Sequence, residues 1–374
     1  MSGYLYARIK DDIKQRIMEG EWLGDMRLPS SRDFAKAYKS SVNTVEKAIR
    51  ELCTDGLLKR DNRRGTFIDY GIVSPRHDRR TGLVAASVIG IENPLWATAL
   101  QGIEDVLRLH GYHLLSFSDD RSLDKLESFV ISAVAKRADG IILSPIFDRK
   151  QEERSRLIYE GLTESGMGVV FLDRHQYDID IPFVTSDNIA GAYKLTKLLL
   201  DQGHRRIVFL RNADLSTFHE RLLGMKQAYL DEGIVFDPNL DVFLPTEFED
   251  FEDEFESFSD QAGAKIKETG CTAVFTANDQ IAEAVIAALG KLDLRVPEDV
   301  SLVTYDALNL NRRLKLDVTG ANQPFYDMGT TAAKLLMNLL EGKDHLSVPG
   351  NICKAEIHYG SSVGPSNEAN IGWD

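Results

Sequence analysis

The sequence predicts two kinds of structure in one chain, a small α+β head at the N-terminus and a larger α/β body. Over residues 4–70, apolar residues at helical spacing are followed by two short strand patterns. From residue 83 onward, short Val, Ile and Leu runs alternate with helical segments, which is typical of α/β structure. Residues 1–80 carry 17 Lys and Arg against 12 Asp and Glu, a net charge of +5, whereas the remainder carries −19. We therefore expect a basic head that meets nucleic acid and an acidic body that does not.

The head follows the order of a winged helix-turn-helix, which is helix, turn, helix and β-hairpin. In its third helix, Val45, Ala48, Ile49 and Leu52 recur at helical spacing, so this face packs into the core. The opposite face can then enter the major groove of DNA, while the arginines and glycine of the hairpin tip can approach a phosphate. The expected elements are a helix over 4–19, a helix opened by Pro29-Ser30, a helix from Ser41 to Gly56, and strands over 57–60 and 66–70.

We predict that the body consists of parallel strands covered by helices on both faces. Its runs of Val, Ile and Leu are unbroken, which is typical of strands that are buried on both sides. Seven or more such units are too many for one open sheet, so we expect two similar lobes. Ligands of such sheets bind at the carboxyl ends of the strands, and two lobes that face each other there would close by hinge motion. The predicted strands are 83–89, 112–117, 140–143, 169–172, 207–210, 273–276 and 301–305, and the predicted helices are 96–109, 122–137, 150–165, 189–202, 219–232, 256–269 and 279–291.

Cysteine usage and hydropathy predict a cytoplasmic protein without a membrane partner. Cys53, Cys271 and Cys353 are odd in number and far apart, so we expect buried free thiols in a reducing compartment. The N-terminal stretch Met1–Lys14 is charged and lacks the apolar segment of a signal peptide. No apolar run approaches the roughly 18–20 residues of a membrane span.

No catalytic motif is visible in the sequence. It lacks the Gly-x-x-x-x-Gly-Lys-Ser/Thr phosphate loop, Gly-x-Gly-x-x-Gly, Gly-x-Ser-x-Gly and His-Glu-x-x-His, and its eight histidines are dispersed. We therefore expect a binding protein with no enzyme activity, no cofactor and no metal. Two other classes stay open, a DNA-binding head fused to a sugar-modifying enzyme and a sugar-binding protein whose head makes protein contacts.

Several motifs resemble known families. The head resembles the winged-helix domain of GntR-family regulators through Leu28-Pro29-Ser30-x-Arg32-x-Phe34-Ala35, Ser41-x-x-Thr44-Val45 and Gly65-Thr66-Phe67. The body resembles the sugar-sensing domain of LacI/GalR-family repressors, itself similar to periplasmic sugar-binding proteins. Its most specific motifs are Gly203-His204-Arg205-Arg206-Ile207 and Val296-Pro297-x-Asp299-Val300-Ser301. A chain that joins these halves resembles the arabinose repressors of the AraR type.

The resemblance implies a winged helix-turn-helix over 1–70, a linker over 71–81, a two-lobed ligand-binding and dimerisation domain over 82–361 with the doubly wound, type I periplasmic-binding-protein-like fold, and a tail over 362–374. Arg, Asn, Asp and Gln side chains supply donors and acceptors for sugar hydroxyls, and an indole covers the apolar face of a pyranose. The implied DNA contacts are Ser30, Arg32, Ser41, Asn43, Thr44, Lys47, Arg63, Arg64 and Gly65. The implied ligand contacts are Trp96, Arg174, Thr217, Arg221, Asn278, Asp306 and Gln323.

Two residues of the head depart from the GntR pattern. Val42 stands where the family often has Arg, and Glu46 where a basic residue is common. An acid that faces a phosphate would repel it, so the operator sequence does not carry over. We expect a homodimeric repressor of carbohydrate-utilisation genes that binds double-stranded operator DNA. A small sugar, a pentose or another monosaccharide, would bind between the lobes and release the DNA, although the sequence leaves open which sugar acts and whether it releases or promotes binding.

Overall fold

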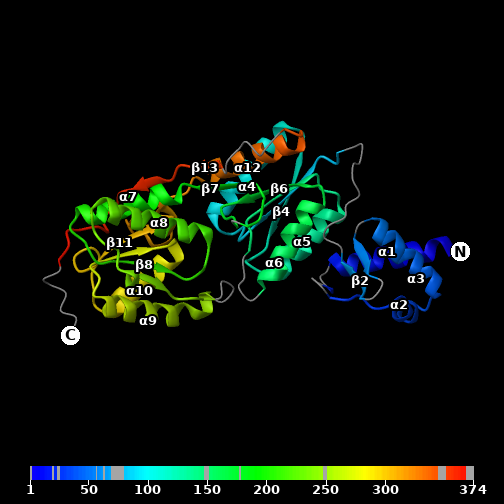
Figure 1. The fold of residues 1–374 in the computed structure, drawn as a ribbon, viewed down its shortest axis with the longest axis horizontal. Helices are drawn as coiled ribbons and strands as arrows, with labels where there is room; N and C mark the ends of the chain where they lie inside the picture. The colour runs from blue at the N-terminus through cyan, green and yellow to red at the C-terminus, as the bar shows by residue number, and fades with distance from the viewer. Residues whose placement is uncertain are drawn as a thin grey trace. The chain divides into compact units, whose positions relative to one another are not determined.

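The computed structural model describes residues 2–18, 21–22, 26–55, 57–61, 64–68, 80–146, 151–176, 178–246, 251–343 and 351–367. Arg63 and residues 71–79 of the expected linker lie outside these ranges. The chain divides into two compact units (Figure 1). The first comprises Met1–Phe183 and Gly329–Pro349, and the second comprises Val184–Met328 and Gly350–Asp374.

The first unit begins with the predicted winged helix-turn-helix. Ser30 and Asp33 form a capping box at the start of the second helix, and Ser41 Oγ accepts a hydrogen bond from the backbone N–H of Thr44 at the start of the third. The two wing strands pair antiparallel. The elements are α1 (Ser2–Met18), α2 (Ser31–Ala37), α3 (Val42–Thr54), β1 (Leu58–Asp61) and β2 (Gly65–Ile68).

A parallel α/β lobe follows the head. Ile141 and Phe171 of its sheet pack with Leu126, Phe129 and Ile158 from two helices in one buried core. The strand order of the sheet is β13-β7-β6-β5-β3-β4, in which β13 and all of β7 except Phe183 are assigned to the second unit. Its elements are β3 (Leu83–Val88), α4 (Pro94–Leu109), β4 (His113–Ser118), α5 (Leu123–Ala135), β5 (Gly140–Leu143), α6 (Glu152–Glu164), β6 (Gly168–Leu172), β7 (Phe183–Ser186) and β13 (Asn351–Cys353).

The second unit holds another sheet, of order β14-β12-β11-β10-β8-β9, which is parallel except for β14. Figure 1 shows α7 and α8 on one side of it and α9 and α10 on the other. The elements are α7 (Asn188–Asp201), β8 (Ile207–Arg211), α8 (Ser216–Asp231), the 3-10 turn η1 (Pro238–Leu240), β9 (Asp241–Phe243), α9 (Phe251–Thr269), β10 (Ala273–Thr276), α10 (Asp279–Lys291), β11 (Ser301–Tyr305), α11 (Ala307–Leu314), β12 (Thr319–Asn322), α12 (Phe325–Leu340), which ends in the first unit, and β14 (Glu356–His358).

The buried His204 of the Gly-His-Arg-Arg-Ile motif holds the C-terminal segment on this sheet. Its ring nitrogens lie 2.8 Å from Thr272 Oγ1, 3.0 Å from Ser301 Oγ and 3.1 Å from the carbonyl oxygen of Gly364. Thr272 directly precedes β10, and Ser301 is the first residue of β11. The contact therefore joins the amino ends of these two strands to the segment around Gly364. The motif therefore has a structural role here.

The predicted head and the two lobes with parallel sheets are confirmed, with three corrections. Strand β14 pairs antiparallel with β12, so the second sheet is not wholly parallel. Of the three thiols expected to be buried, only Cys271 is, whereas Cys53 and Cys353 are partly exposed; none of the three forms a disulfide. The elements β7, β9, β12, β13, β14, α11 and α12 add to the predicted set. No helix within the described ranges is both long and apolar enough to cross a membrane.

Candidate DNA-binding surface and ligand site

The helix α3 presents its expected polar residues on the outside of the head. Arg32, Ser41 and Asn43 are exposed, while Thr44 is half-buried with its Oγ1 2.7 Å from Ser41 Oγ. Val42 is 41% exposed in the first turn of the helix, so an apolar side chain stands beside these polar groups. A surface of this kind can contact base edges, including the methyl group of thymine.

The side chain of Lys47 is directed differently from the other expected DNA contacts. Its Nζ lies 3.8 Å from the ring centroid of Tyr6 in α1. A cation over an aromatic ring is stabilised by the ring quadrupole. Lys47 is therefore held on the flank of α3 that faces α1.

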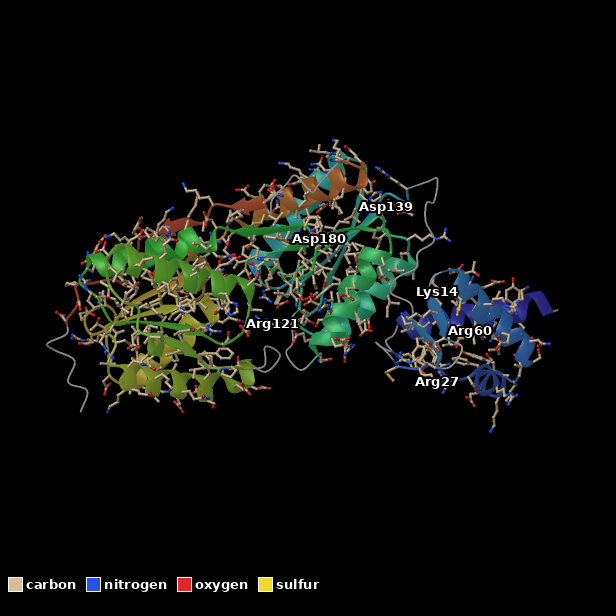
Figure 2. The ribbon with its side chains drawn as sticks, viewed as in Figure 1. Lys14, Arg27, Arg60, Arg121, Asp139 and Asp180 are labelled. Atoms are coloured by element: carbon tan, nitrogen blue, oxygen red, sulfur yellow. The ribbon has the colours of Figure 1, made fainter. Side chains whose placement is uncertain are left out.

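The wing tip is shaped by Gly65, whose φ of +117° is a conformation that favours glycine. A Cβ at Gly65 would lie 2.5 Å from Arg27 Nε, so the arginine packs directly over the glycine. Arg64 donates its backbone N–H to Asp61 Oδ1 at 2.8 Å, and its guanidinium lies 5.4 Å from the Phe67 ring. Arg27, which precedes Leu28-Pro29, is a basic residue at the wing that the sequence motifs did not single out (Figure 2).

The expected ligand residues follow the carboxyl ends of strands, where such sheets bind ligands. In the second unit, Thr217 and Arg221 lie on α8 after β8, and Asn278, Asp306 and Gln323 directly follow β10, β11 and β12 by one or two residues. In the first unit, Trp96 lies in the first turn of α4 after β3, and Arg174 follows β6. Trp96 is 5% exposed, so its indole is mostly covered.

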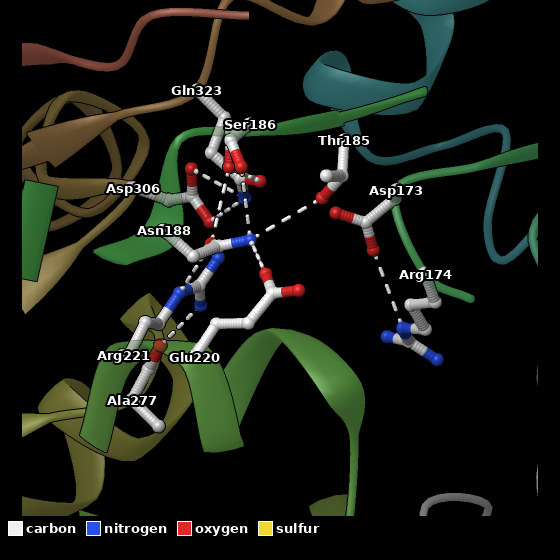
Figure 3. Close-up of polar contacts among 10 residues, drawn as sticks. All are labelled: Asp173, Arg174, Thr185, Ser186, Asn188, Glu220, Arg221, Ala277, Asp306 and Gln323. Carbon is white, nitrogen blue, oxygen red and sulfur yellow. Dashed lines mark hydrogen bonds and ion pairs between the residues drawn. The ribbon is translucent and has the colours of Figure 1, made fainter. Parts of the chain in front are cut away.

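Six polar residues of the second unit join in one hydrogen-bonded cluster, which we call the polar network (Figure 3). Gln323 Nε2 donates to Asp306 Oδ2 at 3.0 Å and Oδ1 at 3.3 Å. Ser186 Oγ lies 2.8 Å from Gln323 Oε1 and 3.1 Å from Asn188 Oδ1, and it can donate to either. The network consists of Ser186, Asn188, Glu220, Arg221, Asp306 and Gln323.

Arg221 is the buried cation of the polar network, with 2% of its surface exposed. Its Nε donates to Asn188 Oδ1 at 2.9 Å and its Nη1 to the carbonyl oxygen of Ala277 at 2.6 Å. The guanidinium carbon lies 3.7 Å from the ring centroid of Tyr305. These contacts fix the plane of the guanidinium, which leaves its remaining donors in a defined direction.

The close crossing of α7 and α8 brings Arg221 to Asn188. A Cβ at Gly224 would lie 2.2 Å from the carbonyl oxygen of Ile189, so only glycine permits this approach. Glu220 Oε2 accepts a hydrogen bond from Asn188 Nδ2 at 2.8 Å. Ser186, Asn188 and Glu220 were not among the expected ligand residues, although Glu220 directly precedes the expected Arg221 in the sequence.

Asn278 and Asp306 occupy similar places but differ in role. Asn278 Oδ1 accepts from the backbone N–H of Ile281 at 2.9 Å and so caps α10. Asp306 has a φ of +61° and makes no side-chain capping bond to α11, which it precedes. Its backbone N–H donates to the carbonyl oxygen of Ala321 at 2.6 Å, which fixes the residue at the strand end. The carboxylate of Asp306 is thus directed to Gln323 rather than to the helix.

The first unit has a buried polar group at its own strand ends. Asp119 accepts from Ser87 Oγ at 2.8 Å and from the backbone N–H of Arg121 at 3.0 Å. Burial raises the pKa of this carboxyl to about 6, although the hydrogen bonds and the charge of Arg174 oppose the shift. Arg174 Nε lies 3.3 Å from Asp173 Oδ2.

The donors and acceptors of the polar network suit a ligand with several hydroxyl groups. Carboxylate and amide oxygens accept from hydroxyls, and the guanidinium and amide nitrogens donate to them. Among the residues that the structure describes, no group of three or more His, Cys, Asp and Glu side chains could hold a metal ion.

Comparisons with known proteins agree with this architecture. A family model described as bacterial regulatory proteins of the gntR family matches residues 5–68, and a periplasmic binding protein-like domain matches residues 196–363. An arabinose metabolism transcriptional repressor of Halalkalibacterium halodurans is 27% identical over 346 residues, which cover 90% of this chain and 89% of that protein. An arabinose metabolism transcriptional repressor of Geobacillus stearothermophilus is 25% identical, and the aligned residues cover 94% of this chain and 95% of that protein. The crystal structure of the transcription regulator CcpA of Lactococcus lactis superposes with a TM-score of 0.66 at 25% identity, covering 76% of this chain and all of that one.

The chain therefore joins a helix-turn-helix domain of the gntR family to a type I periplasmic-binding-protein-like domain of the LacI type. It is a transcriptional regulator of the GntR/LacI type that binds DNA through its helix-turn-helix domain, and it resembles sugar-responsive repressors. These relatives are transcriptional regulators and not enzymes, which agrees with the expected binding role.

Proposed function

We propose that this regulator represses carbohydrate-utilisation genes and leaves its operator when a small sugar binds at the polar network. The observation that carries the proposal is the convergence of Arg221, Asp306 and Gln323 at the carboxyl ends of the strands in the second unit. A sugar hydroxyl that inserts between Gln323 and Asp306 would exchange their hydrogen bonds for its own. Trp96, Arg174, Thr217 and Asn278 stay predicted ligand contacts.

A pentose is the sugar class that we favour. The two relatives reported above are named for arabinose metabolism, and both align with nearly the full length of this chain. The polar network offers one buried cation, two carboxylates and two amides, a set that can pair with several hydroxyls of one small ring. L-Arabinose is therefore the first sugar to test, followed by other pentoses and hexoses.

We further propose that the active form is a homodimer whose two heads read two half-sites. One head is small, and its polar contacts come from a few exposed side chains, so a single copy would bind weakly. The DNA contacts that we propose are Ser30, Arg32, Ser41, Asn43, Thr44, Arg64 and Gly65, together with Arg27 at the wing. Arg63 and Lys47 stay predicted contacts, the latter held over Tyr6.

A thermal-shift screen against a panel of sugars tests the ligand part of the proposal. A ligand that binds the native state raises the unfolding midpoint, by the equivalent of about 2.7 kcal/mol at a hundredfold excess over Kd. We expect a rise with at least one pentose and a clearly smaller rise with that pentose in an Asp306→Asn variant. If no sugar of the panel raises the midpoint of the wild type, a sugar effector is the wrong class.

A further inference from the structure

Glu46 lies on α3, the helix expected to enter the major groove, which we call the recognition helix. Its negative charge is paired with an arginine of the wing. Arg60 Nη2 lies 2.8 Å from Glu46 Oε2 and 2.9 Å from Oε1. The same nitrogen lies 3.3 Å from Ser31 Oγ. A hydrogen bond from Ser31 and the ion pair with Arg60 lower the pKa of the Glu46 carboxyl, so it is ionised at neutral pH.

This cluster joins three elements of the DNA-binding domain. Glu46 lies in the second turn of α3, Arg60 lies in the wing strand β1, and Ser31 is the first residue of α2. Exposed ion pairs contribute little to stability. The side chains of Glu46 and Arg60 are 27% and 43% exposed, so the pair contributes mainly to the relative placement of these elements.

The pair also determines where the Arg60 charge is directed. An arginine at the wing can neutralise a DNA phosphate without reading sequence. Both carboxylate oxygens of Glu46 contact one nitrogen of Arg60, so this guanidinium is oriented toward α3 instead of extending into solvent. The acid therefore restrains a non-specific contact while it aligns the wing with the recognition helix.

We propose that Glu46 is a positioning residue for DNA recognition, which holds Arg60 and Ser31 against α3 and thereby raises the discrimination between operator and non-specific DNA. The residue acts through its neighbours and needs no contact with a base. The proposal depends on the DNA-binding head alone, so it stands or falls independently of the proposed sugar effector.

The chain supplies a matched control on the other flank of the same helix. Glu51 also lies on α3 and also meets a basic residue, because its Oε2 is 3.4 Å from Lys10 Nζ of α1. A change of Glu51 to Gln alters the charge of the head by the same amount. It leaves the contacts of the wing unchanged.

The test measures dissociation constants of the full-length wild type, Glu46→Gln, Glu51→Gln, Arg60→Gln and the Glu46→Gln/Arg60→Gln double variant. The two probes are a duplex selected from a randomised pool with the wild type and a random-sequence duplex of equal length, each titrated over a range of salt. Glu46→Gln should bind the random duplex more tightly, with a salt slope steeper by about 0.9, because Arg60 can then neutralise one more phosphate. Its ratio of selected to random affinity should fall at least about threefold.

Glu51→Gln should keep the wild-type ratio of selected to random affinity. The Glu46→Gln/Arg60→Gln double variant should have the same ratio as Arg60→Gln alone. Arg60→Gln removes the Glu46–Arg60 contact from the other side, so its ratio of selected to random affinity should also fall. This variant therefore tests the proposal if Glu46→Gln does not fold. An unchanged ratio in folded Glu46→Gln would overturn the proposal. The proposal would also be overturned if Glu46→Gln lost discrimination at only one base pair of the selected duplex. That pattern indicates that Glu46 contacts a base directly.

Discussion

Gln323 donates through Nε2 to both carboxylate oxygens of Asp306, at 3.0 and 3.3 Å. The carboxylate only accepts, so it must face the amide nitrogen, and the amide oxygen then lies 2.8 Å from Ser186 Oγ, which can donate to it. Through Gln323, Ser186 at the end of β7 is thus joined to the ends of β11 and β12, and all these residues belong to the second unit. A ligand hydroxyl at this position would have to exchange the hydrogen bonds between Gln323 and Asp306 for bonds of its own.

Asp306→Asn should remove the sugar response and leave DNA binding intact. Asn tolerates the left-handed backbone at this position, so the fold is retained while the charged acceptor is lost. The loss of a hydrogen bond to a charged group predicts a sugar affinity roughly tenfold lower or more. Isothermal titration with the active sugar measures it. Asp317→Asn, at a carboxylate bonded to His358 at 2.9 Å, serves as the control and should bind sugar like the wild type.

Gly224→Ala should destabilise the second unit and weaken sugar binding together. The added methyl group would lie 2.2 Å from the carbonyl oxygen of Ile189, so α7 and α8 must separate and Arg221 must move away from Asn188. We expect a loss of roughly 1–3 kcal/mol in urea unfolding. Gly290→Ala is the matched control, because this helical glycine has nothing within 4 Å of an added Cβ. That variant should be as stable as the wild type or up to about 1 kcal/mol more stable.

Arg32→Ala and Arg64→Ala should each weaken DNA binding without unfolding the body. Both side chains are exposed, and loss of one phosphate contact lowers the salt slope by about 0.9. Gel-shift titrations at several salt concentrations measure this slope. The exposed Arg312 on α11 provides a control, and Arg312→Ala should leave the slope unchanged. An unaltered slope in both head variants would show that the assigned surface does not meet DNA.

Asp119 should make the first unit less stable as the pH rises from about 4 to 7. Its pKa in the folded protein is about 6, above the ordinary value of 3.8, so the folded state binds the proton more tightly than the unfolded state. The resulting stabilisation is complete below pH 4 and is lost as the pH passes through about 6. Relative to Asp119→Asn, the wild type should lose at most roughly 3 kcal/mol over this range. Parallel pH dependences of the two proteins in chemical unfolding would contradict this.

The head was predictable because its signals are local. The Ser30–Asp33 capping box, the spacing of Val45 to Leu52 and the glycine of the hairpin each specify a short segment, and the structure has all three. The buried strands of both sheets were predictable from their unbroken apolar runs. Their helices agree with the prediction within a few residues at each end.

The short strands at or next to the sheet edges and the full polar network were not predictable from such signals. Strand β12 has the sequence Thr-Gly-Ala-Asn, and β9, β13 and β14 have three residues each, so they pair because a neighbouring strand offers its edge. Helix α12 does carry helical spacing at Met328, Ala332 and Leu336, so its signal is present in the sequence. Asn188 and Glu220 join the network through the crossing of α7 and α8, a tertiary contact that their own segments do not encode.

The most direct test of the central claim follows the operator complex by fluorescence anisotropy while each sugar is titrated into it. The probe is a labelled duplex selected from a randomised pool with the wild-type protein. We predict that at least one pentose lowers the anisotropy to that of unbound DNA for the wild type, and that the Asp306→Asn complex needs a concentration of the same sugar roughly tenfold higher or more. If no sugar releases the wild-type complex, or if the same sugar concentration releases both complexes equally, the polar network is not the site through which a sugar controls this regulator.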